Sequence, residues 1–173
     1  SENFIITKIF DFSDANYNIE ESIKILNKSD LTYKVSLLSE LFYNFSTMPE
    51  VKTNFLNSVG GIDNSFEALV NLNGKIERTI LKDLNEIKNY GGRINWTALN
   101  DKYFLFAFIP QKPVGYKSEL LNSKNIVALK TYYLERNLDK KGKLEYSNLI
   151  YVGPKEINTL KSVGSSLELS IDL

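Results

Sequence analysis

The sequence predicts a mainly β protein, a β-sandwich of about seven to eight strands with two or three inserted helices. Short runs of β-branched and aromatic residues recur along the chain, turn-forming residues separate them, and several runs place apolar side chains at every second position. With 173 residues, 43% of them hydrophobic and 24% charged, the chain is long enough to bury one core. No linker, repeat or block of charge divides it, so we expect a single domain over residues 1–173.

The first third of the chain predicts two strands followed by two helices. Residues 3–10 and 20–26 are β-type runs, and the loop between them carries Asp, Ser and Asn together with two aromatic residues that a simple turn does not need. From residue 32 to 45 the apolar side chains fall three or four apart, which predicts a helix. Residues 51–59 lie between a proline and a glycine pair and predict a second, short helix.

The middle of the chain predicts a strand, a helix and a central strand. Residues 65–72 alternate and lead into Asn73-Gly74, which is typical of a strand that ends in a tight turn. Residues 75–90 carry a helical stripe that stops at Gly91-Gly92, so we favour a helix with a glycine cap, although residues 75–80 could also pair as a strand. Residues 93–99 are interpreted as short and irregular. Residues 103–109 are apolar on both faces and predict a central strand that Pro110 ends.

The last third predicts a long loop, a hairpin, a helical turn and a final strand. Residues 110–124 hold two of the four prolines and have no clear period, as expected of a loop. Residues 126–134 and 144–152 are predicted to pair as a hairpin through the turn residues between them. Residues 156–161 suit a helical turn, and the strict alternation in residues 167–173 predicts a terminal strand.

The composition excludes several kinds of chemistry. The chain has no cysteine and no histidine, which rules out thiol nucleophiles, disulfides, Cys/His zinc sites and Ser-His-Asp triads within it. No phosphate loop, dinucleotide fingerprint or calcium-binding loop is present, and no carboxylate pair stands out, so we expect no catalytic residue, no metal and no cofactor. The 21 basic residues equal the 21 acidic ones, which argues against nucleic acid as a partner. The longest apolar run is far shorter than the ~20 residues that span a bilayer.

Exposed aromatic and apolar side chains in two predicted loops are the candidates for binding a protein partner. Phe12 and Tyr17 lie in the first loop, and Val114 and Tyr116 lie in the proline-bearing loop. A core does not need side chains at these places, and aromatic residues dominate protein interfaces. Trp96 could also anchor a partner, but packing in the core is the favoured interpretation.

The order of the elements carries a resemblance to a known family. It rests on the first strand, residues 4–10, the Asn-bearing loop after it, the strand at residues 22–26, the helical segment at residues 33–45, the run Tyr103 to Phe108 that contains Ala107, and the alternating end of the chain. This layout resembles the TssJ family, the outer-membrane lipoprotein of type VI secretion systems, which is a periplasmic β-sandwich with extra helices. The chain departs from the family in lacking a proline and glycine pair in the first loop and in the length of residues 75–99.

The resemblance implies a location and a partner. It implies a lipid-bearing cysteine just before Ser1, attachment to the outer membrane on the periplasmic side, and contact between the first loop and the large inner-membrane protein of the secretion complex. Phe12, Asn16 and Tyr17 are the residues to which it assigns that contact. The membrane would then be touched only through the lipid anchor upstream of Ser1.

Three hypotheses about function follow. The first is a periplasmic, lipid-anchored adaptor of a bacterial secretion system that binds a larger membrane-complex protein and turns nothing over. The second is a carboxylate-dependent glycan hydrolase, which requires two acidic side chains about 5 to 10 Å apart in a cleft. The third is a secreted interaction or effector domain without a lipid anchor.

Overall fold

The computed structural model describes residues 2–12, 16–44, 66–81, 84–123 and 126–171. These residues form twelve strands, one α-helix and one 3-10 helix. All strand pairs are antiparallel. The mainly β, sandwich-like fold class is therefore confirmed, with more strands and fewer helices in this part of the chain than we expected.

The elements have the following bounds. The strands are β1 Phe4–Phe12, β2 Asn18–Asn27, β3 Tyr33–Val35, β4 Leu38–Asn44, β5 Glu67–Leu72, β6 Lys75–Ile80, β7 Lys88–Asn100, β8 Phe104–Lys112, β9 Gly115–Ser123, β10 Ile126–Tyr133, β11 Arg136–Leu138 and β12 Lys143–Pro154. The helix α1 spans Ile157–Val163, and the 3-10 helix η4 spans Leu167–Ser170.

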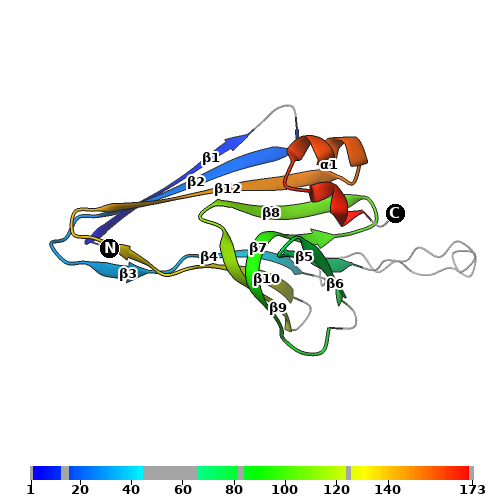
Figure 1. The fold of residues 1–173 in the computed structure, drawn as a ribbon, viewed down its shortest axis with the longest axis horizontal. Helices are drawn as coiled ribbons and strands as arrows, with labels where there is room; N and C mark the ends of the chain where they lie inside the picture. The colour runs from blue at the N-terminus through cyan, green and yellow to red at the C-terminus, as the bar shows by residue number, and fades with distance from the viewer. Residues whose placement is uncertain (1, 13–15, 45–65, 82–83, 124–125, 172–173) are drawn as a thin grey trace, which may run out of the picture.

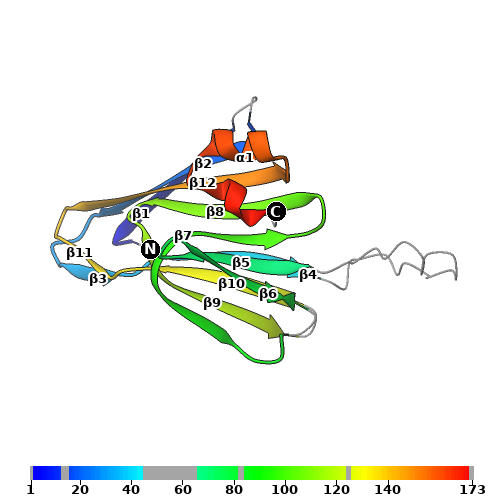
Figure 2. The same ribbon diagram turned by 45° about the vertical axis from the view of Figure 1, so that its right-hand side comes forward.

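One large sheet curls over to make both layers. Ten strands belong to it, and its main path runs β1-β2-β12-β8-β7-β9-β10-β4, while β11 and β3 form a separate two-stranded sheet. The long strand β7 connects the layers, because its first part pairs with β9 and its last part pairs with β8 and β5, with a register shift between Gly91 and Ile94. Figures 1 and 2 show β2, β12 and β8 in one layer and β4, β10 and β9 in the other.

The apolar side chains gather on both faces of the β12-β8-β7 layer. The inner core lies between the layers and includes Ile23, Ile25, Leu41, Val70, Phe108, Leu120, Val127, Leu129, Tyr133, Leu144 and Tyr146. The outer core includes Leu69, Trp96, Ala98, Leu105, Ile109 and Tyr151, and Leu160 of α1 and Leu167 of η4 cover it. Both leucines are fully buried, so each contributes about 1.5–3 kcal/mol. The carboxy-terminal segment therefore covers the outer face of this layer, as a third layer would.

The helix predicted for residues 32–45 is wrong, because this segment forms β3 and β4. β4 pairs with β10, and Leu41 lies opposite Leu129 in the inner core. The three-and-four spacing came from apolar residues that the strand leaves on its outer side, such as Leu38 and Phe42, which are exposed. The second predicted helix, residues 51–59, lies outside the described residues.

The helix predicted for residues 75–90 is also wrong, and the alternative of a strand over residues 75–80 is confirmed. Asn73 and Gly74 both have positive φ, 53° and 86°, which is the geometry of a type I′ turn. Such a turn sends the chain straight back, so β6 pairs with β5. Gly91-Gly92 does not cap a helix but lies in β7, at its register shift. The predicted strand at residues 65–72 is confirmed as β5.

Trp96 and Pro110 lie in strands where we expected irregular chain. Residues 93–99 belong to β7, and Trp96 is fully buried there. β8 is the predicted central strand, between β12 and β7, but it continues past Pro110 to Lys112. The proline is accommodated because it lies opposite Asn148, at a register shift in the pairing with β12. The long loop expected from residue 110 to 124 is replaced by a short turn and β9.

The predicted hairpin between residues 126–134 and 144–152 is wrong, although both strands exist. β10 pairs with β9 and β4, whereas β12 pairs with β2 and β8. The chain between them forms β11, which pairs with β3 and carries β12 to the other layer. The first two predicted strands and the helical turn at residues 156–161 are confirmed as β1, β2 and α1.

The strand predicted for residues 167–173 is wrong, since Leu167–Ser170 forms η4. The segment is fixed by polar contacts to the outer face of the sheet instead of by strand pairing. Trp96 Nε1 donates to the carbonyl of Ser165 at 3.1 Å. One Nη of Arg78 donates to the carbonyls of Leu169 and Ser170, at 3.3 and 3.1 Å.

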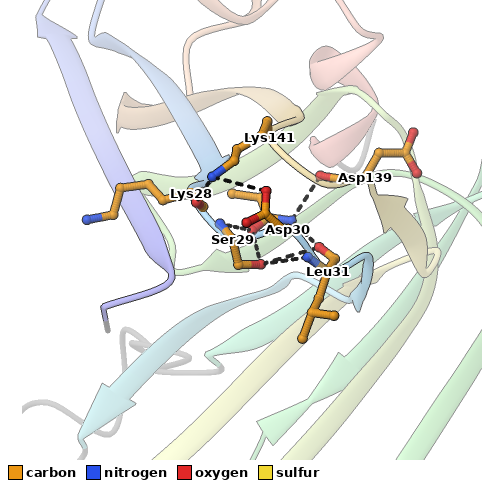
Figure 3. A network of polar contacts seen from close by, with 7 residues as sticks. Lys28, Ser29, Asp30, Leu31, Asp139 and Lys141 are labelled. Atoms are coloured by element: carbon orange, nitrogen blue, oxygen red, sulfur yellow. Dashed lines mark hydrogen bonds and ion pairs between the residues drawn. The ribbon is translucent and has the colours of Figure 1, made fainter.

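A buried asparagine organises the narrow end of the molecule, where β2 ends beside the turn between β11 and β12 (Figure 3). Asn27 is 1% exposed. Its amide nitrogen donates to the carbonyls of Leu31 and Asp139, at 2.7 and 2.9 Å. Its amide oxygen accepts from the backbone N–H and the hydroxyl of Ser29, at 2.9 and 2.8 Å. Lys141 adds a hydrogen bond to the Lys28 carbonyl at 2.6 Å, so two distant turns are joined at one point.

Candidate functional site

The first strand is an exposed, apolar sheet edge. Among the described strands, β1 pairs with β2 and with no other, so one side of its nine-residue backbone is unpaired within these residues. All residues of β1 after Phe4 are exposed, and five of them are large and apolar: Ile5, Ile6, Ile9, Phe10 and Phe12. Soluble proteins usually blunt such edges with charge, proline or bulges, because an unpaired edge pairs with other chains. We call Phe4–Phe12 the β1 edge.

Both faces of the β1 edge carry large apolar side chains. Side chains alternate along a strand, so Ile5 and Ile9 lie on one face while Ile6, Phe10 and Phe12 lie on the other. The second face is the inner one, since Ile6 lies opposite the core residue Ile25. A strand with large apolar side chains on both faces is typical of the middle of a sheet, yet β1 is an edge strand.

The inner face of the edge continues into a row of apolar side chains on neighbouring strands, which runs from the exposed Phe12 to the buried Phe108. Phe12 lies opposite Ile19, Ile19 opposite Ile150, and Ile150 opposite Phe108, which makes one row across four strands. Three strand spacings make this row about 14 Å long. On the same face, Val152 lies one step further along β12 and is 50% exposed, and Phe104 lies two steps further along β8 and is 59% exposed. The β1 edge therefore borders a wider apolar surface.

A buried polar network lies at the base of this surface. Glu21 is 4% exposed, and its two carboxylate oxygens are each 2.7 Å from a partner, Lys8 Nζ and Asn148 Nδ2. Asn148 in turn accepts a hydrogen bond from Tyr133 Oη at 2.5 Å. Burial, reinforced by the negative charge of Glu21, raises the pKa of Tyr133 well above its usual range. The carboxylate is thus engaged on both oxygens, and the ammonium group that balances it comes from the β1 edge.

The structure brings together the residues predicted in the first loop. Phe12 ends β1, Asn16 is exposed in the connection, and Tyr17 is exposed just before β2. The Tyr17 carbonyl accepts the Val152 N–H at 3.0 Å, which ties the connection to β12. Gly153 permits this approach, because a Cβ there would lie 2.8 Å from Tyr17. The Tyr17 ring lies 6.4 Å from that of Tyr151.

The residues predicted in the second loop lie elsewhere. Val114 and Tyr116 are each 39% exposed, at the turn after β8 and at the start of β9. Tyr17 meets β12 at Val152, which lies opposite Phe106, whereas Lys112 lies six residues further along β8. At about 3.4 Å per residue the two groups are separated by roughly 20 Å. They cannot form one contact surface of the size that a single loop makes.

The described residues offer little for catalysis or for holding a metal. No group of three Asp or Glu side chains within them is placed to hold a metal ion. In the described ranges, no helix has the length and apolar character needed to cross a bilayer. The expectation that the chain uses no cofactor stays a prediction.

Sequence reasoning missed most of the β1 edge. Its residues were assigned to an ordinary first strand, because isoleucine and phenylalanine in a β-type run usually indicate the core. The available signal was the lack of alternation: a half-buried strand should show one polar face, and residues 4–10 do not. Lys8 is the one charged residue in that run, and its ammonium group lies on the inner face, where it pairs with the buried Glu21.

The fold has known counterparts among solved structures. A galactose mutarotase-like protein from Clostridium acetobutylicum superposes with a TM-score of 0.61 at 8% identity, covering 87% of this chain and 56% of that one. A putative aldose 1-epimerase from Escherichia coli gives 0.59 at 6% identity, with coverage of 87% and 60%. At such low identity the likeness concerns the fold alone. The molecule is thus a β-sandwich with an exposed apolar edge, and these solved structures share its fold.

The family follows from the sequence comparison. The model of the YidC periplasmic domain matches residues 1–173, so the chain belongs to that family. Proteins named membrane protein insertase YidC are similar to it: the one from Syntrophus aciditrophicus is 26% identical over 168 residues, and the one from Geobacter metallireducens is 25% identical over 170 residues. These matches cover 96% and 97% of this chain but 29% and 30% of the relatives. The chain spans about 30% of the length of the curated relatives it matches.

The family corrects our predictions about identity and partner. The resemblance to the TssJ family is wrong, and so are the function as a type VI secretion adaptor and the partner in a secretion complex. The hydrolase and effector alternatives do not fit this family either. The lipid anchor depended on the same resemblance and is withdrawn with it. The periplasmic location is confirmed by the family, whereas attachment to the outer membrane has no support.

Proposed function

We propose that this chain is the periplasmic part of a membrane protein insertase, and that it binds an extended apolar protein segment at the β1 edge. Its family and the names of its relatives support the first half of the proposal. The β1 edge supports the second. The chain stands on the periplasmic side of the inner membrane in this proposal, as part of a protein about three times its length.

The observation that carries the proposal is a nine-residue edge strand that pairs on one side only among the described strands and has large apolar side chains on both faces. Strand addition to a sheet edge uses backbone hydrogen bonds for affinity and side-chain packing for selectivity. If the added segment had one polar face, that face would lie beside Ile5 and Ile9 or beside Ile6 and Phe10. One of these two apolar pairs would then remain beside polar side chains. A segment apolar on both faces, as membrane-bound segments are, buries both sets at once.

The residues predicted in the two loops form two separate groups, and one of these groups extends the site. Phe12, Asn16 and Tyr17 lie where an added strand would leave the edge, so they contact the chain that follows it. Val114 and Tyr116 lie about 20 Å away along the sheet and belong to a different contact.

The proposed role involves no chemical turnover. Glu21, the buried acid of the inner face, already has a partner on each carboxylate oxygen, Lys8 on one and Asn148 on the other. We therefore expect the chain to leave the mutarotation rate of glucose and galactose unchanged in polarimetry. An acceleration that Glu21→Gln abolishes would contradict this part of the proposal.

Hydrogen exchange tests the strand addition. The probe is a nine-residue peptide of valine, leucine and threonine with a lysine at each end. Strand addition pairs only every second backbone amide of β1, so it should slow exchange at alternate residues of Ile5 to Asp11. The matched control peptide has the same side chains but N-methyl groups on alternate residues, which remove its edge donors. Equal protection by both peptides, or protection of consecutive amides, would refute strand addition.

A crosslinking experiment tests the role in the complete insertase. A photoreactive phenylalanine analogue is placed at Phe12 and, as the control, at Leu134; these side chains are 69% and 59% exposed. During insertion of a defined membrane protein, we expect adducts to that protein from Phe12 and few from Leu134. Equal yields at both positions would contradict the proposed site.

A further inference from the structure

A second site lies where β8 ends. A cavity of about 550 Å3 is lined by Arg93, Asn95, Ile109, Pro110, Gln111, Lys112, Val114, Ser165 and Ser166. Its walls come from β7, from the end of β8 with the turn after it, and from the connection between α1 and η4. Its volume is within the range of small-molecule sites. β8 is the fourth strand from the sheet edge, counting β1, β2 and β12, so this cavity is distinct from the β1 edge.

The charge of the cavity has one sign. Arg93 and Lys112 are the charged residues of its lining, and no acidic residue lines it. In the described part of the chain, neither of these two side chains has a hydrogen bond or ion pair, unlike Arg78, which is fully engaged with Glu67 and η4. Two cations that line one cavity without a counter-charge repel each other, so an anion bound between them is favoured.

The remaining lining limits the kind of anion. Gln111, Ser165 and Ser166 are exposed and offer neutral donors and acceptors, while Ile109 and Val114 give an apolar wall. An arginine pairs with phosphate oxygens through two parallel hydrogen bonds, and a lysine acts as a point charge. The cavity is larger than a bare phosphate needs, and its neutral polar side suits hydroxyl groups.

We propose that this cavity binds a phosphate group carried on a small hydroxylated unit, such as a glycerol phosphate. The same chemistry occurs in a soluble phosphorylated compound and in the headgroup of an anionic phospholipid. The inference stands independently of the proposed protein-binding role.

Trp96 provides a reporter for the cavity. It is the only tryptophan of the chain, and its indole N–H donates to the carbonyl of Ser165, a lining residue. The chain therefore has one indole N–H resonance, and occupation of the cavity should move it. Glycerol 1-phosphate is titrated at low ionic strength, with glycerol as the uncharged comparison. We expect a saturable shift with the phosphate and none with glycerol.

Charge-neutral variants locate the binding. The double variant Arg93→Gln, Lys112→Gln keeps side chains of similar length, and both positions are exposed, so folding should be unaffected. Loss of two charge-assisted contacts should weaken binding by about tenfold or more. The control variant Lys24→Gln, Lys140→Gln removes two exposed charges, one from β2 and one from the turn between β11 and β12, and should bind as the parent chain does. No saturable shift in the parent, or an equal shift in the Arg93/Lys112 variant, would overturn the proposal.

A vesicle arm distinguishes the two sources of phosphate. Vesicles of phosphatidylglycerol in phosphatidylcholine are sedimented with the parent chain and both variants. If the parent chain and the control variant sediment with the vesicles and the Arg93/Lys112 variant does not, the site is assigned to a lipid headgroup. A shift with glycerol 1-phosphate without sedimentation assigns it to a soluble compound. Sedimentation that the Arg93/Lys112 variant retains in full shows binding outside the cavity and contradicts the lipid assignment.

Discussion

Replacing Arg78 should release the carboxy-terminal segment from the sheet. This side chain is 25% exposed, and its guanidinium holds Glu67 Oε2 at 3.2 Å and the carbonyls of Leu169 and Ser170 at 3.3 and 3.1 Å. A hydrogen bond to a charged group contributes about 1.5–3 kcal/mol when it is well buried. These three contacts are long and partly hydrated, so we take about 1 kcal/mol for each. Arg78→Met should therefore lower the free energy of unfolding by about 3 kcal/mol.

Urea unfolding followed by Trp96 fluorescence measures this loss. Trp96 lies beneath the carboxy-terminal segment, because its indole N–H bonds to Ser165, so its emission reports on that segment. For a chain of this length, about 3 kcal/mol corresponds to a melting temperature lower by roughly 6–12 °C. Arg78→Lys keeps the ion pair with Glu67 but cannot reach both carbonyls, so its loss should be intermediate.

A matched control separates docking from loss of charge. Arg93→Met removes an exposed arginine with no described partner and should change the free energy of unfolding by less than about 0.5 kcal/mol. Equal stability of the Arg78→Met and Arg93→Met chains would show that the contacts to η4 contribute nothing, and would refute the reasoning.

Three further predictions concern other parts of the fold. Asn27→Ala removes four hydrogen bonds of a buried amide and should lower the free energy of unfolding by about 2–4 kcal/mol in chemical denaturation. Asn27→Asp keeps the acceptor oxygen but loses the two donated hydrogen bonds. A loss of stability in the aspartate variant but not in the alanine variant would count against this account. Gly115→Ala would place a Cβ 2.8 Å from Thr131 Cγ2 and should lower the melting temperature, at a cost of about 1–3 kcal/mol, whereas Gly91→Ala meets nothing within 4 Å and should be nearly neutral. Hydrogen bonds from Lys117 and Tyr132 lower the pKa of Glu119, so its contribution to stability is complete above the unfolded pKa of about 4.3 and is lost as the pH falls through the lower folded pKa. The stability difference between the parent and Glu119→Gln should thus shrink below about pH 4 in acid titrations, and a difference that grows there would contradict the assignment.

The sequence predicted the strands whose signal is local and misassigned those that depend on distant partners. Alternation and the Asn73-Gly74 turn were enough to predict β5 and its ending. Residues 32–45 show a helical spacing, but within them β4 pairs with β10, more than eighty residues away in the chain, and β3 pairs with β11. No local pattern carries that information, and pairing with β10 overrides helix propensity.

The candidate site was predicted in part, for a related reason. Phe12 and Tyr17 were identified because they lie in a loop, where a core does not claim them. Ile6 and Ile9 were not identified, because apolar residues in a β-type run usually indicate the core, and whether another strand covers β1 depends on distant parts of the chain. Phe104 was likewise assigned to a covered central strand, yet it lies at the strand end and is 59% exposed.

The continuity of β7 limits how the molecule can move. A sandwich made of two separate sheets can slide or open along its core, since only side chains join the layers. Here one backbone is hydrogen-bonded to β9 in its first part and to β8 and β5 in its last part. Opening the core would require bending that backbone at the irregular stretch from Gly91 to Ile94. A load applied at the β1 edge should therefore pass through β2, β12 and β8 into β7, and reach the opposite layer without separating the two.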